Sequence, residues 1–224
     1  MSNKTYRQIC SVARTLDVVG ERWTLLLIRD LLTGPQSYSA LLEGLPGLTT
    51  NLLAKRLRTL QEAELVEAIE VGDQDQKSSA RGAYALTKAG RALAPALGAL
   101  AEWGVKYAPA AGPDATMNHR WLLLVLARRY RTTRERWLVQ LDSEGHQFQF
   151  RLGTDRFESQ VGASWNADLV IHGAPQAIYD LFYDSASPAD MLQAGHVTLA
   201  GPENCREQVW RDFQRAFGLG ESEQ

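Results

Sequence analysis

Cysteine is scarce in this sequence, whose 224 residues include only Cys10 and Cys205. The two lie far apart and form no CxxC pair, so a disulfide framework is not expected and a reducing cytoplasm is the natural setting. Long apolar stretches are missing too: no run of about 20 residues is uniformly apolar, and no basic and apolar leader opens the sequence. We therefore expect a cytoplasmic protein that neither spans a membrane nor is exported.

Signatures of catalysis and of metal binding are also missing. The four histidines, His119, His146, His172 and His196, show no HExxH or other metal-ligand spacing. The sequence contains no Walker loop, no GxGxxG and no GxSxG elbow. We therefore predict that the protein is not an enzyme and uses no metal or cofactor.

The segment from Gly47 to Gln61 combines an apolar stripe with a basic face and contains no acidic residue. Leu53, Leu57 and Leu60 lie at i, i+4 and i+7, the spacing of one side of an amphipathic helix that Thr49 can cap. A different face carries polar and basic side chains: Asn51, Lys55 and Arg58, with Arg56 nearby. A helix anchored on one side and rich in donors on the other suits the DNA major groove, whereas a basic helical face is most often simply solvated.

The neighbouring segments favour the DNA-binding interpretation. Residues 21–32 predict a helix that stops at the breaker cluster Thr33-Gly34-Pro35. Its expected buried side chains are Trp23, Leu26, Leu27 and Leu31. Residues 37–43 predict a short helix, and residues 44–47 form the turn into the basic helix, which together make a helix-turn-helix.

A wing is predicted next. Residues 65–71 alternate as a strand, residues 83–86 form the return strand, and the polar loop 72–82 joins them. Lys77 and Arg81 in this hairpin are placed to reach phosphate or the minor groove. The three parts together predict a winged helix-turn-helix domain.

After the wing, the sequence predicts one long helix. Thr87 can cap it, and an apolar stripe runs from Leu93 to Tyr107. Pro95 lies near its first turns and can bend it. A stripe of this length fills a core or, equally well, forms an inter-subunit contact.

The net charge of −2 becomes informative when the two halves are separated. Residues 1 to 110 carry 13 Lys and Arg against 11 Asp and Glu, whereas residues 111 to 224 carry 11 against 15. The positive charge is therefore local, on the basic helix and the wing, where phosphate groups would be neutralised. Because the excess is small, we expect modest non-specific affinity for DNA.

Several dispersed motifs of residues 10–107 resemble the HxlR family of winged-helix regulators, which are relatives of the MarR type. They are CSVAR at 10–14, GERWTL at 20–25, GP at 34–35, YSAL at 38–41, LAKRL at 53–57, YALTKAG at 84–90 and WG at 103–104. The resemblance implies a homodimer formed through the first and last helices of this half, and DNA recognition through the helix from Thr49. Gln36 and Ser37 stand where the family often carries a basic residue, a departure that affects one backbone contact and not the fold.

These observations together predict a set of residues that contact double-stranded DNA. They are Ser37, Thr49, Thr50, Asn51, Lys55, Arg56 and Arg58 in the helix-turn-helix, and Lys77 and Arg81 in the wing.

Residues 108–118 are rich in Pro, Gly and Ala and predict a linker. It would join a DNA-binding and dimerisation domain, residues 1–107, to a second domain, residues 119–218. Strands are expected at 137–141, 148–152, 156–161, 167–171 and 197–200, and helices at 119–130, from Pro175 to about Tyr183 and from about Glu203 to Phe217. This grouping predicts an α+β domain with an antiparallel sheet.

Three segments of the second half resemble the sterol-carrier-protein type 2 fold. They are ADLVI at 167–171, DMLQAG at 190–195 and VTLAG at 197–201. In that fold apolar ligands lie between sheet and helices, so the resemblance implies a domain that senses an apolar small ligand. The expected ligand-binding residues are Phe148, Phe150, Phe157, Leu169 and Ile171, joined by Trp165, although such residues more often simply fill a core.

Cys10 lies just before the first predicted helix, close to the expected dimer interface. The resemblance implies that a cysteine here can respond to oxidants or electrophiles, and Arg7 and Arg14 could lower its pKa. We favour a small buried packing residue instead, because reactivity requires exposure and a lowered pKa. Cys205 is expected to be structural.

The sequence therefore predicts a homodimeric, DNA-binding transcriptional regulator that acts on a pseudo-palindromic operator, with a C-terminal domain that senses a ligand or stabilises the oligomer. The alternative is a lipid-carrying or small-molecule-binding protein whose winged helix serves protein contacts. An operator-like palindrome near its own gene would favour the first.

Overall fold

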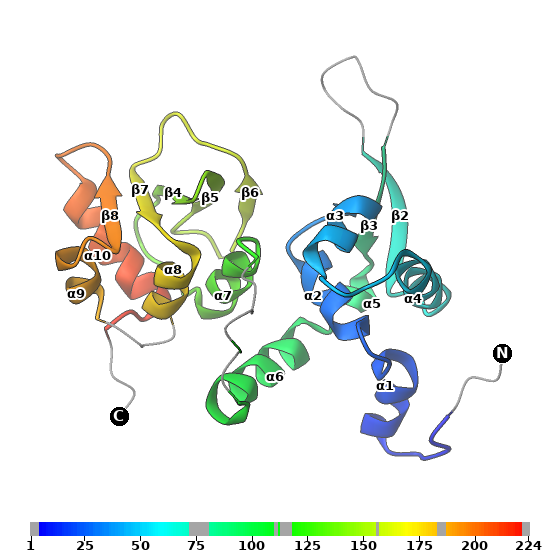
Figure 1. Cartoon of the computed structure of the whole chain (residues 1–224). Helices are drawn as coiled ribbons and strands as arrows, with labels where there is room; N and C mark the ends of the chain where they lie inside the picture. Colours follow the sequence, from blue (N-terminus) through cyan, green and yellow to red (C-terminus); the bar gives the residue numbers. More distant parts are fainter. Residues whose placement is uncertain are drawn as a thin grey trace. The chain divides into compact units, whose positions relative to one another are not determined.

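The computed structural model describes residues 5–71, 81–109, 112, 118–155, 157–182 and 187–220. The chain divides into two units, Met1–Gly112 and Pro113–Gln224 (Figure 1). Each unit has its own hydrophobic core. Much of the predicted linker lies outside the described residues. No helix in the described ranges is long and apolar enough to cross a membrane.

The first unit is a winged helix-turn-helix. Its helices are α1 (Ser11–Val19), α2 (Thr24–Leu32), α3 (Tyr38–Gly44), α4 (Thr50–Glu62), α5 (Lys88–Arg91) and α6 (Ala94–Tyr107). Its strands are β1 (Gln36–Ser37), β2 (Val66–Val71) and β3 (Arg81–Leu86), paired antiparallel in the order β1-β3-β2. The predicted wing hairpin is present, and the two-residue strand β1, which the sequence did not predict, closes its other side.

The core of this unit confirms the apolar stripe of the basic helix: Leu53, Leu57 and Leu60 of α4 are at most 1% exposed. Two expectations for the preceding helix were wrong. The helix begins at Thr24 rather than residue 21, because Trp23 has a positive φ of 78° that interrupts the helical backbone. Leu26, predicted to be buried, is 38% exposed.

The predicted long helix after the wing is divided into α5 and α6. Thr87 caps α5 as predicted: its hydroxyl accepts a hydrogen bond from the Gly90 N–H (3.2 Å) and donates to the Glu64 carbonyl (2.6 Å). Pro95 lies in the first turn of α6, where a residue without an N–H is tolerated and the previous helix cannot continue. No residue of α6 is buried within the chain.

The second unit contains a five-stranded sheet covered by helices. Its helices are α7 (Trp121–Arg129), α8 (Pro175–Phe182), α9 (Pro188–Gln193) and α10 (Arg206–Phe217). Its strands are β4 (Leu138–Ser143), β5 (His146–Arg151), β6 (Ser159–Val161), β7 (Leu169–Gly173) and β8 (Val197–Ala200), in the order β6-β5-β4-β7-β8. The α+β arrangement agrees with the prediction, and α9 is an additional helix.

The prediction of a purely antiparallel sheet was wrong, because β4 and β7 are parallel. After the edge strand β6 the chain passes to the opposite side of β4 and re-enters the sheet there. The buried side chain of Gln140 holds this connection, since its Oε1 accepts from the Ser164 N–H (2.7 Å). The Asp168 carboxylate accepts from the Leu138 N–H (2.8 Å) where β7 begins.

Two histidines pack against each other in this unit. The rings of His119 and His146 are stacked with centroids 3.9 Å apart, and His119 Nε2 lies 3.5 Å from a Glu144 carboxylate oxygen. Burial, and then the neighbouring His146, lower the pKa of His119 below its usual 6.5, although Glu144 opposes them. The folded protein therefore disfavours the protonated form of His119.

This arrangement predicts a pH-dependent stability. The unfolded chain binds a proton at His119 more readily than the folded chain, so the free energy of unfolding should fall as the pH drops below the unfolded value of 6.5. Urea unfolding between about pH 7.5 and pH 5.5 measures this loss, which should be smaller in His119→Gln. The exposed His196→Gln is the control, and equal pH dependence in the wild type and His119→Gln would refute the assignment.

Candidate nucleic-acid interface

The two helices of the helix-turn-helix are fixed by contacts on both sides of their connecting turn. The Tyr38 hydroxyl of α3 donates a hydrogen bond to the Thr50 carbonyl in the first turn of α4 (2.6 Å). Within the turn, Leu45 and Leu48 are buried in the core. The orientation of α4 is therefore determined by burial and by a direct hydrogen bond. Tyr38 was quoted in a sequence motif but was not singled out for this role.

The exposed side of α4 carries most of the predicted DNA contacts. Thr49, at the N-cap position, and Thr50, Asn51, Lys55 and Arg58 are all exposed. Ala54, which sequence reasoning passed over, is exposed between Asn51 and Arg58. A methyl group at this position leaves room for a close approach to bases, so α4 presents donors around a small central residue.

Thr49 differs from its prediction in one detail. It occupies the N-cap position with extended backbone, but its hydroxyl makes no capping hydrogen bond. Ser37 shows the opposite arrangement, because its hydroxyl accepts from the Ala40 N–H (3.2 Å) and caps α3. Ser37 therefore has a structural role, and its predicted contact with DNA stays a prediction.

Arg56 does not belong to the exposed surface, which corrects its place among the predicted DNA contacts. The residue is 8% exposed, and its guanidinium binds the Glu21 carboxylate (Nη2 to Oε2, 2.7 Å) and the Arg22 carbonyl (3.2 Å). It joins α4 to the segment before α2. A guanidinium engaged in this way is not available to a base or phosphate.

The wing residues are only partly described. Lys77 lies outside the described residues, and Arg81 begins β3 but its side chain is not described. Their predicted contacts with the minor groove or phosphate stay predictions.

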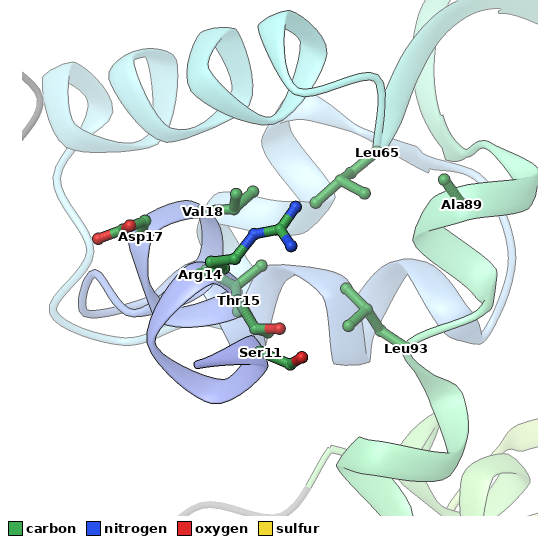
Figure 2. A pocket seen from close by; sticks show the side chains of 9 residues that line it. Ser11, Arg14, Thr15, Asp17, Val18, Leu65, Ala89 and Leu93 are labelled. Carbon is green, nitrogen blue, oxygen red and sulfur yellow. The ribbon is translucent and has the colours of Figure 1, made fainter. Parts of the chain in front are cut away.

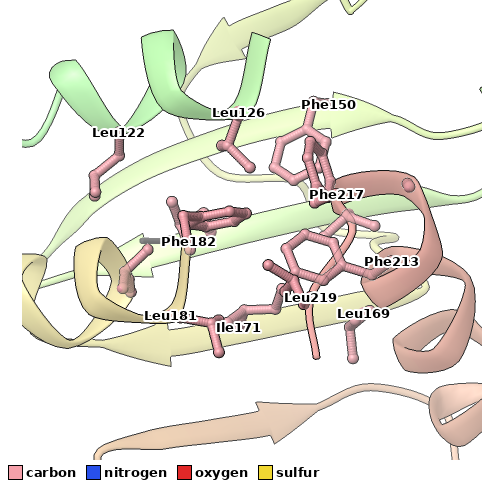
Figure 3. Close-up of a cluster of buried hydrophobic side chains, with 14 of the residues drawn as sticks. Leu122, Leu126, Phe150, Leu169, Ile171, Leu181, Phe182, Phe213, Phe217 and Leu219 are labelled. Atoms are coloured by element: carbon pink, nitrogen blue, oxygen red, sulfur yellow. The ribbon is translucent and has the colours of Figure 1, made fainter. Parts of the chain in front are cut away.

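The proposed ligand residues of the second unit lie in a closely packed core (Figure 3). Phe148, Phe150, Leu169 and Ile171 are at most 2% exposed. The partly buried Phe157 ring contacts Phe150, Tyr130 and Phe217, with centroids 5.3 to 6.3 Å apart. Trp165 was wrongly placed with them, because it is 96% exposed.

Cys10 is exposed, contrary to the packing role that we favoured. It occupies the N-cap position of α1 without a capping hydrogen bond, and the nearby backbone N–H groups of Ala13 and then Val12 lower the pKa of its thiol. Exposure and a lowered pKa are the two conditions that reactivity requires. Elsewhere in the described ranges, no three His, Cys, Asp or Glu side chains come together to form a metal site.

Fold and exposed surface together define a winged helix-turn-helix protein, and comparison with known proteins identifies the family. Residues 18–111 match the sequence model of the family of HxlR-like helix-turn-helix proteins. The chain is 37% identical over 110 residues to Rv3095, an HTH-type transcriptional regulator of Mycobacterium tuberculosis, a match that spans 49% of this chain and 66% of that one. It is 32% identical over 94 residues to YvaP, an HTH-type transcriptional regulator of Bacillus subtilis, spanning 42% of this chain and 83% of YvaP.

Among solved structures, a MarR-family transcriptional regulator from Enterococcus faecalis is 30% identical. That match covers 48% of this chain and 94% of the other, with a TM-score of 0.39. The chain belongs to the family of HxlR-like helix-turn-helix proteins.

The buried position of Arg56 leads to a prediction about stability. Arg56→Ala removes an ion pair and a charged hydrogen bond, and should lower the free energy of unfolding by about 1–3 kcal/mol in urea titrations followed by circular dichroism. Glu21→Gln should cost less, because the Glu21 side chain is 69% exposed and only its charge is removed. If Arg56→Ala keeps the stability of the wild type but loses DNA affinity, Arg56 contacts DNA and does not stabilise the fold.

The exposed thiol leads to a second prediction. Mild oxidation with peroxide should change DNA affinity in the wild type and have no effect in Cys10→Ser, with Cys205→Ser as the control. Gel-shift titrations before and after oxidation measure the difference. An equal response in the wild type and in Cys10→Ser would show that Cys10 is not a redox switch.

Proposed function

We propose that this protein is a transcriptional regulator that binds double-stranded DNA as a homodimer. The observation that carries the proposal is the two-sided α4: its leucine stripe is buried, while Asn51, Lys55 and Arg58 are exposed on a family-typical helix-turn-helix. The relatives are named as transcriptional regulators, which favours a binding role over an enzymatic one. A protein with this function would work in the cytoplasm.

The chemistry of the α4 surface fits direct readout of bases. An arginine such as Arg58 donates two hydrogen bonds to guanine, and an asparagine such as Asn51 pairs with adenine in the same two-point manner. Lys55 adds a flexible cation for a base or a phosphate. Because Arg56 points inward, the cations that α4 presents to DNA are Lys55 and Arg58.

Exposed apolar side chains on α1 and α6 support the dimer. In α6, Leu100, Trp103 and Tyr107 are 54%, 59% and 60% exposed, and the Trp103 and Tyr107 rings lie 5.9 Å apart. Near α1, Ile9 and Val12 are 96% and 67% exposed. Exposed apolar patches of this kind are typical of interfaces. A second copy that covers them would place two α4 helices on one operator.

For the second unit we propose a sensor role in a fold like that of sterol carrier protein type 2. Its support is a sheet with an apolar layer between strands and helices, to which Phe150, Leu169 and Ile171 contribute (Figure 3). An apolar small ligand would have to displace part of this packed layer. The alternative is a lipid or small-molecule carrier whose winged helix contacts proteins. No particular contact among the described residues of the first unit favours it.

Arg58 provides the test of DNA recognition. If it contacts a base edge through two hydrogen bonds, Arg58→Ala should weaken operator binding by about 1–3 kcal/mol and relax specificity at one position of each half-site. Fluorescence anisotropy with operator and random duplexes at fixed salt measures both effects. By contrast, Lys77→Ala should weaken binding to all sequences alike and reduce the salt slope by about one.

The matched control is Arg211→Ala, which removes an exposed arginine from the second unit. It should leave operator affinity unchanged. If the wild type and Arg58→Ala bind operator and random DNA with equal affinities, α4 does not read the sequence.

A further inference from the structure

A pocket of about 540 Å³ lies in the first unit between α1, the start of β2 and the α5–α6 junction (Figure 2). The residues that line it are Ser11, Arg14, Thr15, Asp17, Val18, Val19, Leu65, Ala89 and Leu93. None of them belongs to α4, so the pocket is separate from the DNA-reading surface. Its volume falls in the range of about 300–1,000 Å³ that holds small organic ligands.

The pocket has an apolar side and a polar side. Val18, Leu65 and Leu93 supply most of the apolar wall, whereas Ser11, Arg14 and Thr15 of α1 supply polar groups. Residues 14 and 15 lie three and four positions after residue 11, so both share one side of the helix with it. A ligand of matching shape would have an apolar body and one polar end.

Arg14 determines the charge of that polar end. Its guanidinium extends into the pocket toward Leu65 (Figure 2). Within the part of the chain that the structure describes, it has no hydrogen bond or ion pair. A guanidinium presents its N–H donors in a planar fork that matches a carboxylate, and it is favoured beside apolar surface because it is weakly hydrated.

The one acidic residue of the lining does not compete for Arg14. The Asp17 carboxylate accepts hydrogen bonds from the Thr5 hydroxyl (2.9 Å) and the Tyr6 N–H (2.8 Å). Figure 2 shows its side chain directed away from the guanidinium. Arg14 is therefore the charged group that a ligand in the pocket would meet.

We infer that this pocket binds a small organic carboxylate. The carboxylate pairs with Arg14, the hydroxyls of Ser11 and Thr15 lie on the same side of α1, and the apolar body of the ligand packs on Val18, Leu65 and Leu93. The exposed Val12 and Leu16 of α1 lie on a different side of the helix. On α1, the pocket and the proposed dimer surface therefore use different residues.

The position of the pocket also suggests a consequence for DNA binding, which rests on the proposed function. The pocket joins α1, which belongs to the proposed dimer surface, to Leu65, which leads into β2 of the wing. A ligand placed there favours one spacing of α1 and the wing. Ligand binding and DNA binding are then coupled, because a ligand that prefers one arrangement shifts the population toward it.

The test uses benzoate as the probe and isothermal titration calorimetry of the full chain without DNA. Benzoate should bind, and benzamide, which has the same ring without the charge, should bind at least about tenfold more weakly, as expected for loss of a charge-assisted hydrogen bond. Arg14→Gln should weaken benzoate binding by about the same factor. Arg14→Lys should recover part of it, since the charge remains but the fork is lost.

Arg7→Gln is the matched control, because Arg7 is exposed near α1 but does not line the pocket. It should bind benzoate like the wild type. Circular dichroism confirms that each variant is folded. Failure of both benzoate and hexanoate to bind the wild type, or equal benzoate affinity in Arg14→Gln, would overturn the inference.

A separate titration of operator DNA with and without benzoate tests the coupling. Loss of DNA binding in all conditions would count against the proposed function, whereas calorimetric binding that depends on Arg14 would still support the pocket.

Discussion

The attachment of α4 to the first unit is the constraint on which the rest of the structure depends. A recognition helix must be held rigidly on one side and left bare on the other, and here the holding side combines three buried leucines with the ion pair between Arg56 and Glu21. The Tyr38 hydroxyl adds a hydrogen bond at the first turn. These contacts bury one side of the helix, and Asn51, Lys55 and Arg58 are exposed.

Local periodicity predicted much of this arrangement. Three features depend only on residues close together in the sequence, and each agrees with the structure: the leucine spacing of α4, the Gly-Pro stop after α2 and the Thr87 cap. Arg56 was misplaced because its partner Glu21 lies 35 residues away, a distance that no helical pattern encodes. The positive φ of Trp23 was not foreseen, and Pro95, which was expected to bend one long helix, instead lies in the first turn of a new one.

In the second unit, too, sequence periodicity did not predict contacts between residues far apart in the sequence, here the pairing of strands. Alternating residues predicted the positions of most strands, but alternation does not distinguish parallel from antiparallel neighbours, so the β4–β7 pairing was not foreseen. The groups that fix it, Gln140 and Asp168, act on backbone N–H groups 24 and 30 residues away. The pocket beside Arg14 could not be predicted either, because α1, β2 and α5 come together only in the fold.

The proposed function gives different roles to the helices of the first unit: α4 would read DNA and α1 and α6 would hold a second copy, while α1 also borders the pocket. The central claim is that two α4 helices engage one operator together. Footprinting of the DNA upstream of the protein's own gene at defined salt tests it most directly. The account predicts two protected half-sites related by a dyad, with centres about one helical turn, roughly 34 Å, apart. A single protected half-site, or uniform protection without sequence preference, would contradict it.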